Sequence, residues 1–222
     1  MAITSKDVME LRNLTNVGML DCKKALEEAN GDIQKAQELL RQKGMASAAK
    51  RAGKIASQGI VDSYIHMGGS VGVLVEVNCE TDFVARSEQF KTFVHDLALQ
   101  IASMNPQYVD ETQIPQEIID NEMKIALAQA KETGANKPEK ILQQIADGKV
   151  KKVLKEMCLV DQPFFRDPSK TIKDLISETT ASIGEKLSIR RFVRYEMGEG
   201  LEKKQTEDLA AEVEAQIQAM KK

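Results

Sequence analysis

Valine recurs at every second position over residues 71–77 (Val71, Val73, Val75 and Val77), and this period of two predicts a β-strand. Residues 60–66 (IVDSYIH) are expected to form another strand. The segment 67–70 between them contains two glycines and is typical of a hairpin turn. The strand over 71–77 is expected to stop at Asn78. A third strand is predicted much later in the chain, over residues 188–196.

The rest of the chain has the apolar spacing of helices. We expect three short helices within residues 3–44, and longer ones at Ser87 to about Ser103, Pro115 to about Thr133, Pro138 to about Met157 and Thr171 to about Ile183. Strands placed early and late around a block of helices favour a small antiparallel sheet with helices on one face, so the predicted fold class is α+β.

The same patterns divide the chain into four parts. We predict a three-helix bundle over 1–45, a helical linker over 46–57, an α+β core over 58–200 and a C-terminal helical module over 201–222. In the last part, Leu209, Val213 and Ile217 recur every four residues. Such a stripe must pack on the core or on a partner.

Composition excludes several classes of protein. The net charge is −3, with 31 basic and 34 acidic residues among 222, so the whole-chain balance does not indicate a nucleic-acid binder. The three cysteines lie far apart and form no CxxC pair, which disfavours structural zinc. No apolar run approaches the length of about 20 residues that spans a bilayer. We expect a soluble protein of the cytoplasm, or of an organelle after processing.

The chain lacks the residue patterns of catalysis. It has no glycine-rich phosphate loop, no metal-ligand spacing and no nucleophile with an evident base. Of its two histidines, His66 is expected at the tip of the β-hairpin, and His95 in the apolar face of a helix, packed or partly buried. We therefore predict a protein that is not an enzyme, holds no cofactor or metal and does not bind a nucleotide directly.

The stretch VEVNCETDFVAR, residues 75–86, changes abruptly from strand to helix spacing. An acidic turn over 80–82 is followed by one large apolar side chain, Phe83. Thr81 or Asp82 can cap the turn while Phe83 enters the core. Alternatively, Asp82 and Phe83 form an exposed probe for a partner. The local sequence leaves both interpretations open.

Two further segments also have two interpretations. Met19 and Leu20 are expected in a glycine-containing loop before the second helix, either as core residues or as an exposed contact. Lys50, Arg51 and Lys54 in the linker could touch RNA or form a solvated basic face, and the solvated face is favoured.

Three motifs together resemble one protein family. They are LTNVGMLDCKKALEEANGDIQKAQELLRQKG near the start of the chain, NCETDFVAR in the middle and RYEMGEGLEK towards its end. In this order they resemble elongation factor Ts, which releases GDP from elongation factor Tu. The resemblance implies that the N-terminal bundle is similar to a ubiquitin-associated domain, and that elongation factor Tu is the partner.

The resemblance also implies roles for individual residues. Phe83 would wedge between elements of elongation factor Tu near its magnesium ion, and Asp82 would disturb the polar network around that ion. The residues implied at this contact are Thr81, Asp82, Phe83 and Val84; those implied as an anchor are Met19, Leu20 and Lys23; and those implied as further contacts are His66, Leu209 and Val213.

Longer members of this family carry two copies of the core unit, whereas this chain shows one β-hairpin of that kind. The single unit leaves a sheet surface to cover, so we predict that two copies associate through the sheet or the adjacent helices. The helices between Pro115 and Met157 could instead cover that surface within one chain. The competing function is a polypeptide- or RNA-binding adaptor, for which only Arg190, Arg191 and Arg194 beside two aromatic residues offer support.

Overall fold

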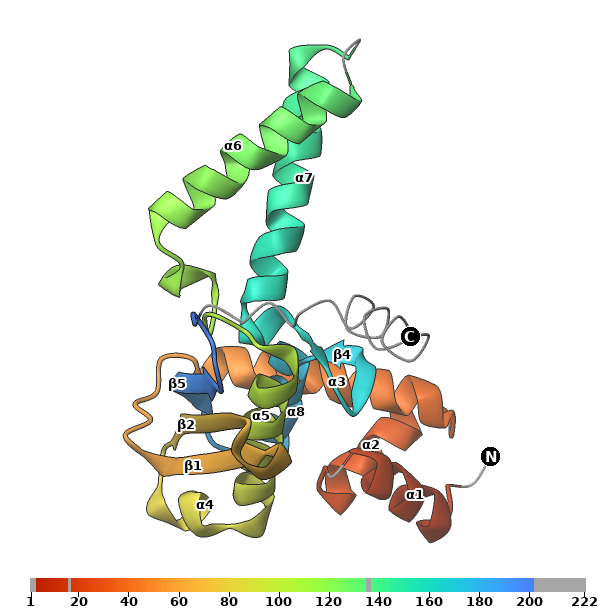
Figure 1. Ribbon diagram of the computed structural model, residues 1–222. Helices are drawn as coiled ribbons and strands as arrows, with labels where there is room; N and C mark the ends of the chain where they lie inside the picture. Colours follow the sequence, from red (N-terminus) through yellow and green to blue (C-terminus); the bar gives the residue numbers. More distant parts are fainter. Residues whose placement is uncertain (1–2, 16, 135–136, 202–222) are drawn as a thin grey trace, which may run out of the picture.

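A computed structural model describes residues 3–15, 17–134 and 137–201 of the chain. Figure 1 shows a small N-terminal helical bundle beside a mixed core, and a helical hairpin that rises from the core. The described residues combine helices with small antiparallel sheets, which confirms the α+β class. The predicted C-terminal helical module, including Leu209 and Val213, lies outside the described residues apart from Leu201.

The bundle consists of α1 (Ser5–Thr15), α2 (Met19–Glu28) and α3 (Ile33–Arg51). Its apolar residues recur at helical spacing, so one face of each helix turns towards a common centre. The buried residues of this cluster are Val8, Leu11, Cys22, Ala25, Leu26, Ala29, Ala36 and Leu40. Asp32 begins the third helix, because its side chain accepts the backbone N–H of Lys35.

The third helix does not end near residue 44 as expected; it continues to Arg51. Its second half packs against α8 (Ile172–Ile183) of the core. Gly44 lies at this contact, where an added Cβ atom would lie 3.4 Å from the Cβ of Ala181. The boundary predicted at residue 45 therefore falls inside a helix, and much of the predicted linker belongs to α3.

The core sheet contains β1 (Gln58–His66), β2 (Val71–Cys79) and β5 (Ser188–Glu196), in the order β1-β2-β5 with antiparallel neighbours. The β-hairpin and the third strand are thus confirmed. The second strand was wrongly expected to stop at Asn78, since its pairing with β1 continues to Cys79. A 3-10 turn, Met67–Gly69, joins the first two strands, and the positive φ of Gly68 and Gly69 suits their lack of a side chain.

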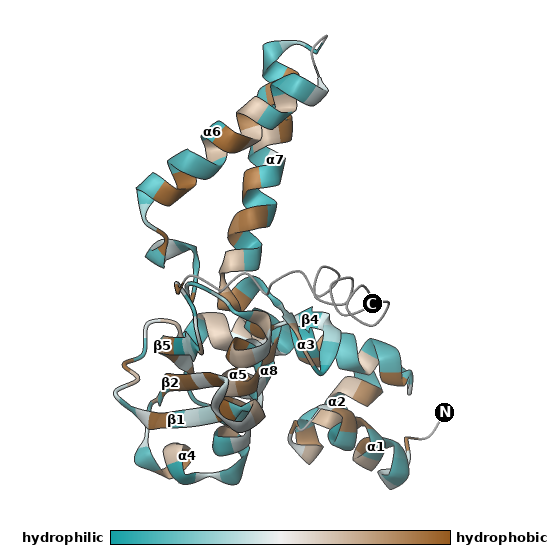
Figure 2. Cartoon of the chain, viewed as in Figure 1, coloured by the Kyte–Doolittle hydropathy of each residue, from teal (hydrophilic) through white to brown (hydrophobic). Residues whose placement is uncertain are grey.

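One helix, α5 (Glu88–Met104), covers the inner face of this sheet. Figure 2 shows hydrophobic colours on both β2 and α5. The fully buried members of this contact are Val75, Val77, Phe90, Val94, Leu97 and Ile101, and each large one contributes about 1.5–3 kcal/mol by leaving water. This apolar contact is the centre of the core.

The helical hairpin consists of α6 (Gln116–Thr133) and α7 (Glu139–Met157), as the sequence predicts. Small residues let the two helices approach each other, with Ala126, Ala146 and Val150 buried between them. At its base, the buried side chain of Gln100 donates to the Pro163 carbonyl oxygen at 3.1 Å. Figure 1 shows that the hairpin projects away from the sheet. It does not cover the sheet's outer face.

Several short elements were not predicted. A two-stranded sheet, β3 (Pro163–Phe164) with β4 (Asp167–Thr171), follows a 3-10 turn at Leu159–Asp161. A five-residue helix, α4 (Asp82–Arg86), follows β2 where a turn was expected. Another 3-10 turn, Glu111–Gln113, precedes α6.

Among the described residues, no helix is both long and apolar enough to cross a membrane. The division of the chain into four domains remains a prediction.

The contact at Gly44 generates a test of how firmly the bundle is held to the core. Gly44→Leu should lower the free energy of unfolding by about 1–3 kcal/mol, because the larger side chain forces α3 away from α8. The matched control is Gly148→Leu in α7, where an added Cβ atom meets nothing within 4 Å. That change should raise stability by up to about 1 kcal/mol through helix propensity. Urea unfolding followed by circular dichroism measures both, and equal stabilities would contradict the contact.

Candidate partner-binding site

Phe83 is the most exposed aromatic side chain of the described chain, at 84% of its full accessible area. It lies in α4, directly after the end of β2. The interpretation in which Phe83 enters the core is therefore wrong. A phenyl ring left in water contributes no burial free energy to the free protein, so that free energy is available to a contact with a partner.

The turn before Phe83 is fixed by its own side chains. Thr81 is the N-cap of α4, since its hydroxyl oxygen accepts the backbone N–H of Val84 at 3.4 Å. The Cys79 thiol donates to the Thr81 carbonyl oxygen at 3.1 Å. Cys79 is fully buried, and this desolvation raises the pKa of its thiol. The strand end and the cap are thereby held together.

Two carboxylates, those of Glu80 in the turn and of Glu185 far along the chain, also connect this turn to distant segments. The Glu80 carboxylate accepts the backbone N–H of Lys186 at 2.7 Å and pairs with Arg51 at 3.1 Å. These bonds, first that of Lys186 and then that of Arg51, hold the pKa of Glu80 below its ordinary value. Stability from this carboxylate is therefore present above about pH 4.5 and is lost as pH falls through the lower, folded-state pKa. Glu185 accepts three hydrogen bonds from Glu80 and Thr81.

Asp82 precedes Phe83 and is also exposed. Its carboxylate pairs with Arg86 one helical turn later, at 3.1 Å. Exposed pairs of this kind contribute only about 0.2–1 kcal/mol, so a partner could exchange this pair for another at small cost. We call residues Glu80–Arg86 the probe turn.

Met19 and Leu20 do not lie in a loop, as the sequence suggested. They are the first two residues of α2, for which Gly18 is the N-cap. Their side chains are 45% and 74% exposed, so they are not core residues. Lys23 follows on the same helix and pairs with Glu27 at 3.8 Å. We call Met19 and Leu20 the anchor pair. In Figure 1, α2 and α4 both lie away from the tip of the helical hairpin.

The two histidines lie near each other on the side of the sheet that faces α5. The Tyr64 hydroxyl and Nδ1 of His66 are 2.9 Å apart, and the Tyr64 ring meets the His95 ring edge-on. His95 was expected to be packed or partly buried in an apolar face; it is not enclosed, because its side chain is 49% exposed, meets the Tyr64 ring and contacts Asp62 at 3.2 Å. His95 lies beside the edge strand β1, where solvent reaches its ring, and the periodicity of the helix does not show how close a residue is to a sheet edge.

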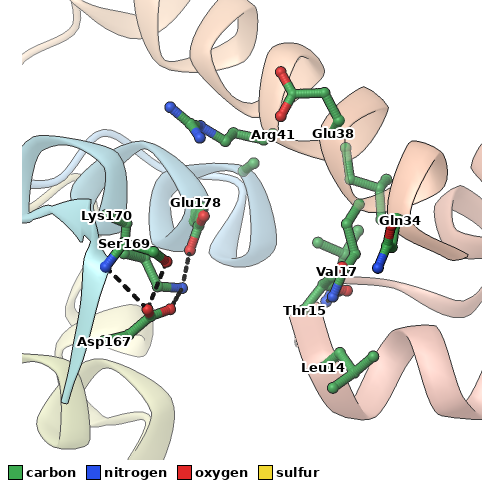
Figure 3. A pocket seen from close by; sticks show the side chains of 13 residues that line it. Leu14, Thr15, Val17, Gln34, Glu38, Arg41, Asp167, Ser169, Lys170 and Glu178 are labelled. Carbon is green, nitrogen blue, oxygen red and sulfur yellow. Dashed lines mark hydrogen bonds and ion pairs between the residues drawn. The ribbon is translucent and has the colours of Figure 1, made fainter.

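A groove of about 250 Å³ lies between the bundle and the core, lined by residues of α1, α3, β4 and α8 (Figure 3). Its central cation, Lys170, pairs with Asp167 at 3.5 Å and with Glu178 at 2.9 Å. None of its lining residues belongs to the probe turn or the anchor pair. Because Lys170 is paired inside the groove and Arg41 pairs with Asp174 beside it, the groove is best explained as a seam between two packed units. No cluster of three metal-ligating side chains occurs within the described ranges.

The arginines that could support an RNA-binding adaptor are engaged within the protein. Arg190 and Arg191 both donate to Glu76 at 2.8 Å, and these bonds lower the pKa of Glu76. Arg194 is only 10% exposed and donates to the carbonyl oxygen of Ala102 at the end of α5. The linker residue Arg51 is held by Glu80. These contacts remove the main support for the adaptor.

Known proteins are similar in sequence to this chain, and the similarity includes the segment that carries the exposed Phe83. A family model described as "Elongation factor TS" matches residues 2–199. Elongation factor Ts of Carboxydothermus hydrogenoformans is 55% identical over 219 residues, which are 99% of this chain and 100% of the relative. That of Geobacter sulfurreducens is 53% identical over 215 residues, or 97% and 98% of the two chains. This chain belongs to the elongation factor Ts family.

Membership of the elongation factor Ts family confirms the resemblance that the three motifs indicated, and it makes the chain a translation elongation factor. Thr81, Asp82, Phe83 and Val84 lie together in one cap and helix, whereas the anchor pair lies on another element. His66 lies near the β-hairpin turn. Sequence reasoning missed Glu185, because a carboxylate that follows a helix-ending glycine gives no periodic signal.

Proposed function

We propose that this protein is a guanine-nucleotide exchange factor for elongation factor Tu. The observation that carries the proposal is the exposed Phe83 on a turn held by several hydrogen bonds, in a chain of the elongation factor Ts family. A factor that binds the nucleotide-free partner more tightly than the GDP-bound partner must weaken GDP binding by the same ratio. Such a factor needs no covalent chemistry of its own.

In this mechanism, Phe83 enters a pocket of the partner near the magnesium ion and the phosphates of GDP. Burying one phenyl ring contributes about 1.5–3 kcal/mol, which corresponds to roughly a tenfold to hundredfold change in an equilibrium constant. The ring is already exposed, so the factor does not have to unpack its own core to present it. The binding free energy is therefore available to displace elements of the partner.

Asp82 then brings a negative charge towards the magnesium site. Its pair with Arg86 is exposed, so the carboxylate can leave it at small cost and compete for the polar groups that surround the ion. Thr81 and Val84 shape the cap that sets the direction of both side chains.

The anchor pair and Lys23 hold the factor on the partner while GDP leaves. Two neighbouring apolar side chains at a helix N-terminus form a compact contact, and such central apolar residues often dominate an interface. His66 is proposed as a weaker contact at the β-hairpin, and Leu209 and Val213 as contacts of the C-terminal segment.

The first test removes the wedge. Phe83→Ala should slow the release of fluorescent GDP from elongation factor Tu by about tenfold or more, since the buried ring is lost from the complex. Stopped-flow fluorescence gives the rate, and thermal melting should stay within a few degrees of the wild type because Phe83 is exposed. Ile125→Ala, which removes an exposed apolar side chain from the helical hairpin, is the matched control. A folded Phe83→Ala protein that releases GDP at the wild-type rate would refute the wedge.

The second test concerns the anchor pair. Met19→Ala with Leu20→Ala should weaken the complex by about tenfold to hundredfold, because two apolar contacts are lost, while stability changes little. Calorimetric titration against elongation factor Tu measures the affinity, and Met9→Ala on α1 serves as a control for an exposed methionine. Unchanged affinity in a folded double variant would refute the anchoring role.

We further propose that two copies associate through the outer face of the sheet. This face carries several exposed apolar side chains that no described element covers: Val61, Ile65, Leu74 and Tyr195. They are adjacent across β1, β2 and β5, so they form one patch, and the same patch on a second copy is complementary to it under two-fold symmetry.

The third test is the mass of the free protein. Light scattering should give about twice the chain mass of 24.6 kDa, and Leu74→Glu should halve it by placing a charge in the patch. Ile125→Glu on the helical hairpin is the matched control and should leave the mass unchanged. A free mass near 24.6 kDa with a one-to-one complex would show that one core unit suffices.

A further inference from the structure

We infer that Glu185 is a positioning residue for exchange: its carboxylate holds the probe turn in the orientation that presents Phe83. This inference rests on the proposed function. Glu185 lies between the end of α8 and the start of β5, 105 residues after Glu80 in the sequence. Its role is thus a tertiary contact between distant parts of the core.

The Glu185 carboxylate uses both oxygens on the turn. One accepts the backbone N–H groups of Glu80 and Thr81, at 3.1 and 3.0 Å. The other accepts the Thr81 hydroxyl at 2.7 Å. Hydrogen bonds to an ionised acceptor are roughly twice as strong as neutral ones, and three of them fix both the backbone and the capping side chain of Thr81.

Glu185 is itself held in place on both sides. Gly184 ends α8 in the left-handed conformation, and its N–H donates to the Thr180 carbonyl oxygen at 2.9 Å. Leu187, two residues later, is buried in the core. A short chain segment fixed at both ends leaves the Glu185 side chain few alternative positions.

The turn also binds the residue after Glu185, so each segment holds the other. The Glu80 carboxylate accepts the backbone N–H of Lys186 at 2.7 Å. The Lys186 ammonium group in turn donates to the carbonyl oxygens of Ala52 and Lys54, just after α3 ends. Three separate segments, Ala52–Lys54, Glu80–Thr81 and Glu185–Lys186, therefore meet behind Phe83.

These contacts do more than stabilise the fold. The apolar core already fixes the last residues of β2 and the start of α5. Between them, the buried Ala85 and the partly buried Val84 pack α4 on the core, but neither side chain holds Glu80 and Thr81, which precede the helix. Hydrogen bonds from Glu185 supply the missing restraint, and a restrained contact residue loses less entropy on binding.

The test uses the full chain and elongation factor Tu loaded with fluorescent GDP. Glu185→Ala should slow GDP release by about tenfold at limiting factor concentration, because the probe turn must be ordered on binding. Glu185→Gln keeps the size of the side chain but loses its charge, so its rate of GDP release should lie between those of the wild type and of Glu185→Ala. This variant also provides the test if the alanine variant does not fold. The matched control is Glu178→Gln on α8, which makes the same charge change but pairs only with Lys170.

A double variant separates positioning from general stability. If Glu185 acts through the probe turn, then adding Glu185→Ala to Phe83→Ala should slow GDP release by a smaller factor than Glu185→Ala does in the wild-type protein, because only Asp82 remains to be positioned. Without any partner, amide hydrogen exchange followed by NMR should show faster exchange at Glu80 and Thr81 in Glu185→Ala than in the wild type.

The outcomes distinguish the two proposals. Faster amide exchange with unchanged GDP release in Glu185→Ala, while Phe83→Ala slows release, would overturn the positioning role and leave the exchange function standing. Unchanged amide exchange at both positions would also overturn it. If Phe83→Ala and Glu185→Ala both release GDP at the wild-type rate, the wedge mechanism fails, and the positioning role fails with it.

Discussion

The burial of α5 against the inner face of the three-stranded sheet is the contact on which the rest of this structure depends. It fixes the end of β2 and the start of α5, which are separated by only the probe turn and Ser87. Phe90, Val94, Leu97 and Ile101 fill the core, and the probe turn adds the buried Ala85 and the partly buried Val84 to it, so Phe83 is not needed there. The core therefore permits an aromatic ring to face water, and the free energy that its burial would release remains available for binding.

An exposed ring is useful to an exchange factor only if its direction is fixed. The hydrogen bonds around Glu80 and Thr81 reach to the segment before β5 and to the end of α3. These bonds act together, because they restrain both the backbone of Thr81 and the carboxylate of Glu80. Their effect is to limit the conformations of a five-residue helix that has little apolar packing of its own.

The helices and strands that could be predicted from the sequence are those with a regular spacing of apolar residues. The strand 188–196 has the bounds expected, although a bulge opposite Glu76 and Val77 interrupts the alternation of its buried and exposed residues. The turn residues Thr81 and Phe83 were identified, but only resemblance favoured exposure of the ring. Glu185 could not be predicted, since a polar contact across 105 residues leaves no period in either segment. Met19 was placed in a loop because Gly18 suggests a turn, whereas that glycine is a helix cap.

The long helix α3 connects the anchor pair to the probe turn. It begins in the bundle that carries the anchor pair and ends at Arg51, which binds the probe turn through Glu80. A helix of 19 residues spans about 28 Å and is stiff on that scale. Its contact with α8 at Gly44 holds it to the core midway. The separation of anchor and probe is thereby fixed before the partner arrives. In the proposed mechanism, free energy gained where Met19 and Leu20 bind can then act at Phe83, because remote contacts promote a change only when the geometry between the two sites is rigid.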